Sequence, residues 1–256
     1  MKILLIGAMP SENKYIIDSL KLVKTELLEG FFPLYYKKLR NKEIFLVQCY
    51  VGTINASAAS VLGIQKIRPD LVIKVGCVGA NSLRIKKNSL LVPTLFFHTG
   101  AWITRSYMDN KPIADSSYWQ ILFGDKPDQN SRKNLGGIPF IFFPDRKYNQ
   151  KYKSVLKALN KKYIEAALGS GDMVIYDKKF IKNIQNKIVG VNKLWCSDNE
   201  TYPIAQICYI TKTAFMGIFF VASSDYDDID GYNPKNINYQ TKKTIVPIVK
   251  EFVKKV

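Results

Sequence analysis

The sequence predicts an α/β fold with three layers (αβα) around a twisted mixed central sheet. Apolar runs of strand length alternate with segments whose apolar residues recur at helical spacing. Residues 43–79 read as strand, helix and strand with a glycine-containing turn after each strand, which a parallel crossover explains. The 256 residues are 47% hydrophobic, enough for one large core. We therefore expect residues 1–256 to form a single domain.

The amino-terminal part begins with an expected strand at Lys2–Ile6, an apolar run followed at once by a turn. Residues 12–29 carry apolar side chains on one helical face and end at Gly30, so this segment predicts a helix. The run 43–50 is rich in residues that favour strands and predicts the next strand.

The crossover continues with residues 55–67, which are rich in Ala and Ser and stop before Pro69. This composition predicts a helix that packs closely on a sheet. The apolar run 71–75 predicts a buried strand, and the run 89–97 predicts another.

Residues 104–150 differ from the rest of the chain. They are polar, with Asp, Asn, Lys, Gly and Pro throughout, which predicts a loop-rich insertion that could serve as a lid. The patterns at its end and beyond predict helices at 148–159, 161–167, 201–213 and 241–254 and strands at 187–195 and 217–222.

The inventory of reactive side chains narrows the chemistry. The chain has one histidine, His98, and four cysteines with no C-x-x-C pair. A zinc site needs His or Cys at close spacing, so no metal is expected, and the cysteines are expected to be buried free thiols. Catalysis would therefore rest on Asp, Glu, Lys or Tyr, without a cofactor.

The charge and hydropathy patterns bear on partners and location. The net charge is +17, but the lysines are scattered and form no block of five or more, so nucleic acid is not the expected partner. The apolar runs are too short to span a membrane, and the amino-terminal run is too short for a signal peptide. We expect a cytoplasmic protein with no membrane partner.

Ligands of parallel α/β sheets bind beyond the carboxyl ends of the strands. The segments that follow the expected strands are 7–12, 51–55 and 76–79. These segments are the first places to look for a site.

Five stretches in these and later segments carry a resemblance to a known family. They are 2–12 (KILLIGAMPSE), Val51-Gly52 before the Ala-rich helix, 68–79 (RPDLVIKVGCVG), 170–172 (SGD), and 198–200 (DNE) with Ser224-Asp225. In this order they resemble the purine nucleoside phosphorylase and nucleosidase superfamily, most closely the bacterial 5′-methylthioadenosine/S-adenosylhomocysteine nucleosidases. The resemblance covers most of the chain except about 104–137.

The resemblance implies a nucleoside phosphorylase/hydrolase-like fold and a homodimer with the pocket near its interface. It implies hydrolysis of the N-glycosidic bond of a small-molecule purine nucleoside, either 5′-methylthioadenosine or S-adenosylhomocysteine, with release of adenine and no cofactor. Such cleavage passes through an oxocarbenium-like sugar, and carboxyl groups can protonate the base, activate water and hold the ribose.

Three carboxylates match the family's working residues. Asp225 follows an apolar strand and corresponds to the general acid toward the purine N7, although it could be a solvated loop residue. Glu12 corresponds to the glutamate that activates water, although a first-turn glutamate also suits the helix dipole. Glu200 corresponds to the glutamate that accepts hydrogen bonds from the ribose hydroxyls, although it could be a helix-start acid.

The family resemblance also implies the other residues of the pocket. Asp172 lies in the Ser-Gly-Asp stretch, after which the family backbone reads the purine edge, and His98 receives no role. The expected substrate-binding residues besides Glu200 are Asn199, Ala8, Met9, Val51, Gly79, Val174, Ile175 and Ser224.

Several positions depart from the nucleosidase pattern: Pro10, Ser11, Cys77, Asn199 and Val221 replace family residues. They put the base and the 5′ group in doubt but leave the three carboxylates in place.

Two alternatives stay open. One is a phosphate-dependent phosphorylase, because phosphorylases place an arginine at the position of Lys74 and lysine can also bind phosphate. The other is a non-enzymatic protein of this fold that binds nucleic acid or polyanions.

Overall fold

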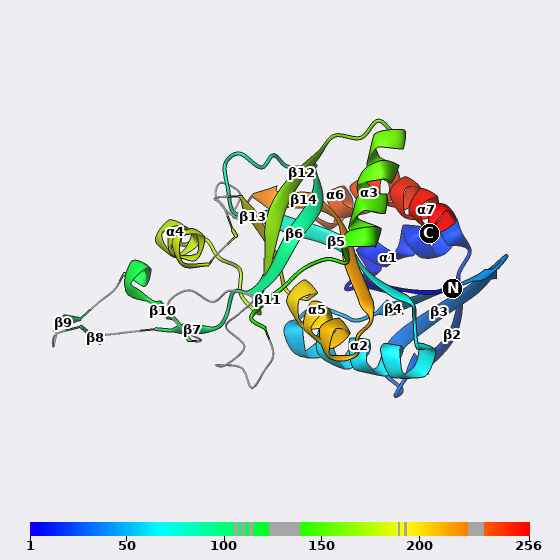
Figure 1. Ribbon diagram of the computed structural model, residues 1–256, viewed down its shortest axis with the longest axis horizontal. Helices are drawn as coiled ribbons and strands as arrows, with labels where there is room; N and C mark the ends of the chain where they lie inside the picture. The colour runs from blue at the N-terminus through cyan, green and yellow to red at the C-terminus, as the bar shows by residue number, and fades with distance from the viewer. Residues whose placement is uncertain are drawn as a thin grey trace.

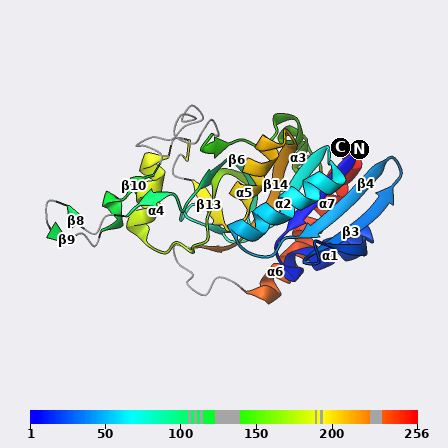
Figure 2. The same ribbon diagram turned by 90° about the horizontal axis from the view of Figure 1, so that it is seen from below.

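The computed structural model describes residues 1–104, 107–108, 111–112, 115–122, 139–188, 190–191, 194–224 and 233–256. In this part of the chain, helices cover both faces of a mixed 10-stranded sheet, which makes the three layers that the sequence predicts (Figure 1). The amino and carboxyl termini lie near each other, at the end of the molecule opposite helix α4 (Lys178–Lys187) and the short strands of 102–121 (Figure 2).

The sheet follows the order β11-β6-β12-β13-β5-β1-β4-β3-β2, and β14 pairs with both β5 and β6. Its centre is parallel, since β1 pairs in parallel with β4 and β5, and β5 with β14. The hairpin strands β2 and β3 are antiparallel. The strands are β1 (Lys2–Gly7), β2 (Val23–Leu28), β3 (Phe32–Leu39), β4 (Lys42–Gln48), β5 (Leu71–Ala80), β6 (Leu90–His98), β11 (Ile141–Phe142), β12 (Tyr163–Ser170), β13 (Trp195–Asp198) and β14 (Ala214–Ser224).

The two faces of the sheet bury different side chains of the same strand. Ile3 and Leu5 of β1 belong to one core, while Leu4 and Ile6 belong to the other, as the two-residue period of a strand requires. The first core lies under α1 (Pro10–Leu20), α3 (Arg146–Ala158), α6 (Pro234–Gln240), a π-helical turn (Thr241–Ile245) and α7 (Val246–Lys255).

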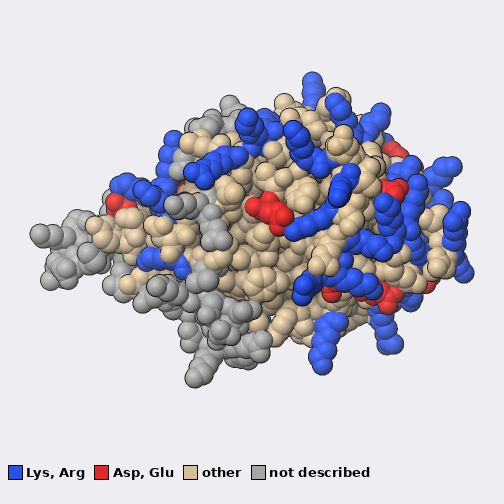
Figure 3. All heavy atoms as spheres, turned by 45° about the horizontal axis from the view of Figure 1, so that its top comes forward, with Lys and Arg blue, Asp and Glu red and all other residues tan. Residues whose placement is uncertain are grey.

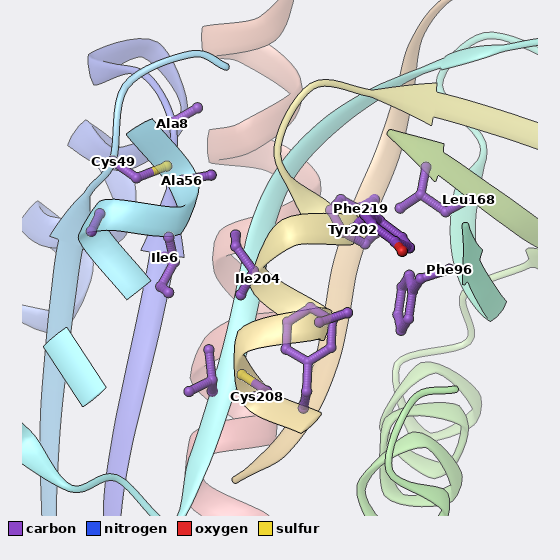
Figure 4. Close-up of a cluster of buried hydrophobic side chains, with 14 of the residues drawn as sticks. Ile6, Ala8, Cys49, Ala56, Phe96, Leu168, Tyr202, Ile204, Cys208 and Phe219 are labelled. Atoms are coloured by element: carbon purple, nitrogen blue, oxygen red, sulfur yellow. The ribbon is translucent and has the colours of Figure 1, made fainter. Parts of the chain in front are cut away.

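The second core lies under α2 (Thr53–Ile67) and α5 (Thr201–Ile210). Figure 4 shows side chains of this core from both layers: Ala56 comes from α2 and Ile204 from α5, while Ile6, Phe96 and Phe219 come from the sheet. The Ala-rich α2 can approach the sheet closely because its inward side chains are small.

The predicted helix 12–29 is wrong beyond Leu20. Helix α1 ends at Leu20, and the next residue, Lys21, takes a left-handed conformation (φ 54°). The chain then forms β2, which pairs with β3. The apolar residues of 22–28 fit helical spacing, but pairing along an available strand edge decides the outcome. Strand β3 was also not predicted.

Two later predictions are also wrong. Residues 161–167 are not helical, because most of them belong to β12, which lies between β6 and β13. In the predicted strand 187–195, Lys187 belongs to α4, and among the described residues only Trp195 lies in a strand, as the first residue of β13. Helix α4 precedes it, and Asp177 caps that helix by accepting hydrogen bonds from the amides of Lys179 and Phe180.

The predicted insertion at 104–150 lies partly outside the described residues. Its described part includes a short 3-10 turn (Ser116–Tyr118), the ribbon of β8 (Tyr107–Met108) with β9 (Lys111–Pro112), and strand β11. It also includes β10 (Gln120–Ile121), which pairs with β7 (Trp102–Ile103) just before the predicted insertion. Helix α3 begins at its end, close to the predicted helix 148–159.

Two surface properties complete the description. Lys and Arg side chains spread over much of the face in Figure 3 rather than gathering in one patch, as their scatter along the sequence predicts. Among the helices of the described chain, none combines the length and the apolar character that crossing a membrane requires.

Candidate active site

A cavity of about 330 Å³ opens where β1, β4 and β14 end, at the edge of the sheet that the sequence indicates. Its volume is within the range of small-molecule sites. Its described lining residues are Ala8, Met9, Glu12, Val51, Cys77, Val78, Gly79, Met173, Val174, Tyr176, Ser197, Asp198, Asn199, Glu200, Ala222 and Ser223.

Glu12 is held rigidly at the cavity wall. It occupies the first turn of α1, and its Oε2 accepts hydrogen bonds from the amides of Ala8 and Met9, each at 3.1 Å. Its Oε1 accepts a hydrogen bond from the amide of Cys77 at 2.9 Å. Only 5% of the residue is exposed. These three hydrogen bonds fix the direction of the carboxyl group, so Glu12 suits the role of an oriented base.

Glu200 reaches the same cavity from the position immediately before α5. It is 6% exposed, and its Oε1 accepts a hydrogen bond from the amide of Gly52 at 3.3 Å. Its Oε2 lies 3.4 Å from Nζ of Lys74. Burial raises the pKa of Glu200 to about 7, and the charge of Lys74 opposes that rise. This carboxyl therefore changes charge near neutral pH.

Lys74 is fully buried behind the cavity wall, with 0% of the residue exposed. It lies on β5, on the same face as Val72, and that face is covered by α5. Burial alone would lower the pKa of Lys74, but Glu12 and then Glu200 raise it above its ordinary value. Lys74 is therefore a permanent cation that faces carboxylates rather than the cavity.

A polar network fixes the start of α5. Asp198 accepts hydrogen bonds from the amide and hydroxyl of Thr201 and from the hydroxyl of Ser170. The hydroxyl oxygen of Ser170 in turn accepts a hydrogen bond from the amide of Tyr202 at 2.9 Å. Burial raises the pKa of Asp198. Because Glu200 lies between these partners, its position in the cavity is set by this network.

The structure brings most of the predicted site residues together. The cavity wall includes Glu12, Glu200, Asn199, Ala8, Met9, Val51, Gly79 and Val174. Asn199 is oriented by donating a hydrogen bond from its Nδ2 to the carbonyl of Gly171 at 2.6 Å.

Three other predicted residues are placed differently. Ile175 is buried in the core cluster around α4, away from the cavity wall. Ser224 ends β14 directly after the lining residue Ser223. Asp225 lies outside the described residues.

Asp172 and His98 have local partners. Asp172 accepts hydrogen bonds from the amide (2.7 Å) and the hydroxyl of Thr53, and so caps the start of α2. Nδ1 of His98 accepts a hydrogen bond from the amide of Gly100 at 2.9 Å.

Sequence reasoning missed Tyr176, the one aromatic side chain among the described residues of the cavity wall. Tyr176 and Met173 come from the segment after β12. Since residues 161–167 were expected to be helical, this segment was not recognised as the end of a strand. A correct strand assignment would have drawn attention to Tyr176.

The described site offers acid–base chemistry through carboxyl groups. Glu12 provides an oriented pair of oxygens, and Glu200 provides acceptor oxygens for hydroxyl groups. Among the described residues of the wall, none is Lys or Arg, so no cation there is ready to receive an anionic reactant.

Comparison with known proteins identifies the family of the chain. The family model named Phosphorylase superfamily matches residues 2–255. The 5′-methylthioadenosine/S-adenosylhomocysteine nucleosidase of Buchnera aphidicola subsp. Schizaphis graminum is 24% identical, over 100% of this chain and 97% of its own length. The enzyme of that name from Exiguobacterium sp. is 27% identical, over 89% of this chain and 85% of its own length.

Solved structures share the fold. The crystal structure of the Campylobacter jejuni 5′-methylthioadenosine/S-adenosyl homocysteine nucleosidase matches with a TM-score of 0.80 at 19% identity, over 100% of both chains. The Neisseria meningitidis nucleosidase in complex with methylthio-immucillin-A matches with a TM-score of 0.76 at 19% identity, over 100% of this chain and 99% of that chain. The futalosine hydrolase of Helicobacter pylori matches with a TM-score of 0.75 at 16% identity, over 100% of this chain and 98% of that chain.

Proposed function

The chain belongs to the phosphorylase superfamily, and from that membership we propose that it hydrolyses the N-glycosidic bond of an adenosine-type nucleoside, 5′-methylthioadenosine or S-adenosylhomocysteine, and releases adenine. The observation that carries this proposal is Glu12, a buried carboxylate held by three backbone amides at the wall of a nucleoside-sized cavity. In this role Glu12 orients and activates the attacking water.

The other two carboxylates complete the reaction. Glu200 accepts hydrogen bonds from the ribose hydroxyls, which its two oxygens and its place on the cavity wall allow. Asp225 donates a proton to N7 of the leaving purine. This role rests on the family resemblance and on the sequence, in which Asp225 directly follows the end of β14. The two lining residues Ala222 and Ser223 belong to that strand.

Water is the nucleophile that the electrostatics favour. A phosphate in the cavity would meet the charge of Glu12, and Lys74, the cation at the phosphorylase arginine position, is fully buried and lies beside Glu200. The described part of the wall includes no Lys or Arg. The phosphate-dependent alternative is therefore not favoured.

The apolar part of the wall supports a purine with an apolar 5′ group. Met173, Val174 and Tyr176 lie together after β12, where their side chains can pack against a flat base. The names of the similar proteins point to methylthio and homocysteine nucleosides.

We also propose that the enzyme is a cytoplasmic homodimer. Ile54 is 81% exposed at the start of α2, next to Val51 of the cavity wall. An exposed apolar side chain beside a pocket suits an interface with a second copy. Light scattering coupled to size-exclusion chromatography is expected to give twice the mass of the chain.

Base release from a nucleoside panel tests the proposed function. The panel contains 5′-methylthioadenosine, S-adenosylhomocysteine, adenosine, inosine, guanosine and futalosine, with products separated by chromatography. We expect adenine from the two thio-nucleosides at the highest kcat/KM. Release from another nucleoside alone would correct the substrate, and no release from any of them by a folded sample would contradict the proposal.

The pKa of Glu200 predicts the pH profile. A protonated Glu200 loses an acceptor for the ribose hydroxyls, and its pKa is raised to about 7 chiefly by burial. We therefore expect kcat/KM to rise as the pH increases through about 7. Assays between pH 5 and pH 9 check this, and a profile that is flat or falls across that region would contradict the role of Glu200.

Gly76→Ala is expected to displace Glu12 from its position in the site, although the substitution changes no charge. A Cβ at this position would lie 2.5 Å from Oε1 of Glu12 and 3.1 Å from Nζ of Lys74, so the glutamate would have to leave its amide partners. We expect kcat to fall at least about tenfold, which corresponds to about 1.4 kcal/mol of transition-state stabilisation.

Gly63→Ala is the matched control for this substitution. Its added Cβ would meet Cδ2 of Leu4 at 3.2 Å, the end of an apolar side chain in the core. This variant is expected to keep its activity. Equal kcat values for the two folded variants would contradict the expectation that Glu12 keeps its position only when residue 76 has no side chain.

A further inference from the structure

Lys74 is a feature that the roles above do not use. A lysine with 0% exposure is rare in a protein core, and keeping it charged there requires nearby opposite charge. The surroundings of Lys74 meet that requirement: its Nζ lies 3.4 Å from Oε2 of Glu200 and donates a hydrogen bond to the carbonyl of Val75 at 3.3 Å.

The same ammonium group is also close to Glu12. An added Cβ at Gly76 would lie 2.5 Å from Oε1 of Glu12 and 3.1 Å from Nζ of Lys74, closer than van der Waals contact allows. Because Gly76 has no side chain, there is room here for the side chains of Glu12 and Lys74 to lie next to each other. Glu12 and Glu200 are far apart in the sequence, and the ammonium group of Lys74 lies close to both of them.

We propose that Lys74 is a positioning residue, a buried counter-ion that keeps Glu12 and Glu200 together as two carboxylates at the cavity wall. This inference rests on the proposed function, in which one carboxylate activates water and the other holds the ribose. Lys74 does not touch the substrate, because no part of it is exposed to the cavity.

The effect of removing the Lys74 ammonium group depends on the titratable groups around it. Glu12 of α1, Glu200 at the start of α5 and Asp198 of β13 all act on it electrostatically, as does Cys49 after β4. Burial raises the pKa of the Cys49 thiol to about 12.

Cys77 of β5 also faces this group of charges, and burial raises the pKa of its thiol. Both thiols are therefore neutral near pH 7, and among the described residues three carboxyl groups share the field of the Lys74 ammonium group. Without the ammonium group, the carboxylates would repel one another, and Glu200 would hold its proton to a higher pH.

The test replaces Lys74 by Met, which has a similar length and no charge, and by Arg, which keeps the charge. The first readout is the titration of the Glu200 carboxyl in the ligand-free protein, by carbon NMR of glutamate labelled at its side-chain carboxyl. The chain has seven glutamates, and Glu200→Gln assigns the signal. Lys74→Met is expected to raise the titration midpoint by about 1–3 pH units, and Lys74→Arg to leave it near that of the unmodified protein.

The second readout is the pH profile of kcat/KM. In Lys74→Met, the rise with pH is expected to move to higher pH, so the loss of activity is larger at pH 6 than at pH 9. Lys42→Met is the matched control. Its ammonium group also donates hydrogen bonds to backbone carbonyls, those of Val253 (2.8 Å) and Lys254 (2.9 Å). Both belong to α7, which packs on the face of the sheet opposite to α5. Lys42→Met should change neither readout.

A folded Lys74→Met protein with an unchanged Glu200 midpoint would overturn the proposal. So would a loss of kcat/KM that is equal at every pH, or an Arg variant that behaves like the Met variant. If Lys74→Met does not fold, Lys74→Gln supplies the neutral side chain for the same measurements. The titration needs no substrate, so a shifted midpoint in an enzyme that releases no base would contradict the proposed function and leave the Lys74–Glu200 coupling standing.

Discussion

Asp225→Asn is expected to lower kcat for adenine release by about 10²–10⁴-fold, the range associated with loss of a general acid. The adenine anion is a poor leaving group unless N7 receives a proton as the bond to the sugar breaks. Asn has nearly the same shape as Asp and can donate a hydrogen bond, but it cannot transfer the proton. KM should therefore change much less than kcat.

The matched controls for this substitution lie a few residues away. Asp227, Asp228 and Asp230 follow Asp225 in the sequence, so replacing each by Asn removes the same charge from the same segment. These variants are expected to keep most of the activity. If one of them loses activity while Asp225→Asn keeps it, the acid has been assigned to the wrong residue.

Glu12→Gln is expected to lower kcat by about 10²–10⁴-fold through loss of the base. The effect on stability should also be measurable. Glu12 accepts hydrogen bonds from the amides of Ala8, Met9 and Cys77, and a glutamine would turn its NH₂ group toward at least one of these donors. Leaving a buried donor unpaired costs about 1–3 kcal/mol of the free energy of unfolding.

Steady-state kinetics and chemical denaturation separate the two effects of Glu12→Gln. The control is Glu26→Gln, which removes a carboxylate from an exposed ion pair with Lys66 on the surface and should change neither quantity appreciably. A Glu12→Gln enzyme with an unchanged kcat would contradict the assignment of the base.

The edge of the sheet at which the cavity lies could be predicted from the sequence, because local patterns of apolar residues indicate where the strands end. The segments 7–12 and 51–55 follow recognisable apolar strands, and parallel strands end at one edge of the sheet. Residues 76–79 were expected to form a turn after a strand 71–75, but they belong to the carboxyl-terminal half of β5. Glu12 and Glu200 are far apart in the chain, but each lies at the start of a helix that packs on this edge. Their meeting at one cavity therefore follows from topology.

The rest could not be obtained from local patterns. Residues 22–28 fit helical spacing, and only the presence of a partner strand makes them β2. The same is true of β12, whose surroundings are set by β6 and β13. The burial of Lys74 depends on α5 covering that face of β5, and the sequence alone presents this lysine as a candidate phosphate ligand.

Adenine release from 5′-methylthioadenosine in phosphate-free buffer tests the central claim most directly. The reaction is run in water labelled with heavy oxygen, with and without added inorganic phosphate, and both products are analysed by mass spectrometry. The account predicts equal rates in the two buffers and one heavy oxygen in the thioribose product. Release that requires phosphate, with a phosphorylated sugar as product, would contradict it.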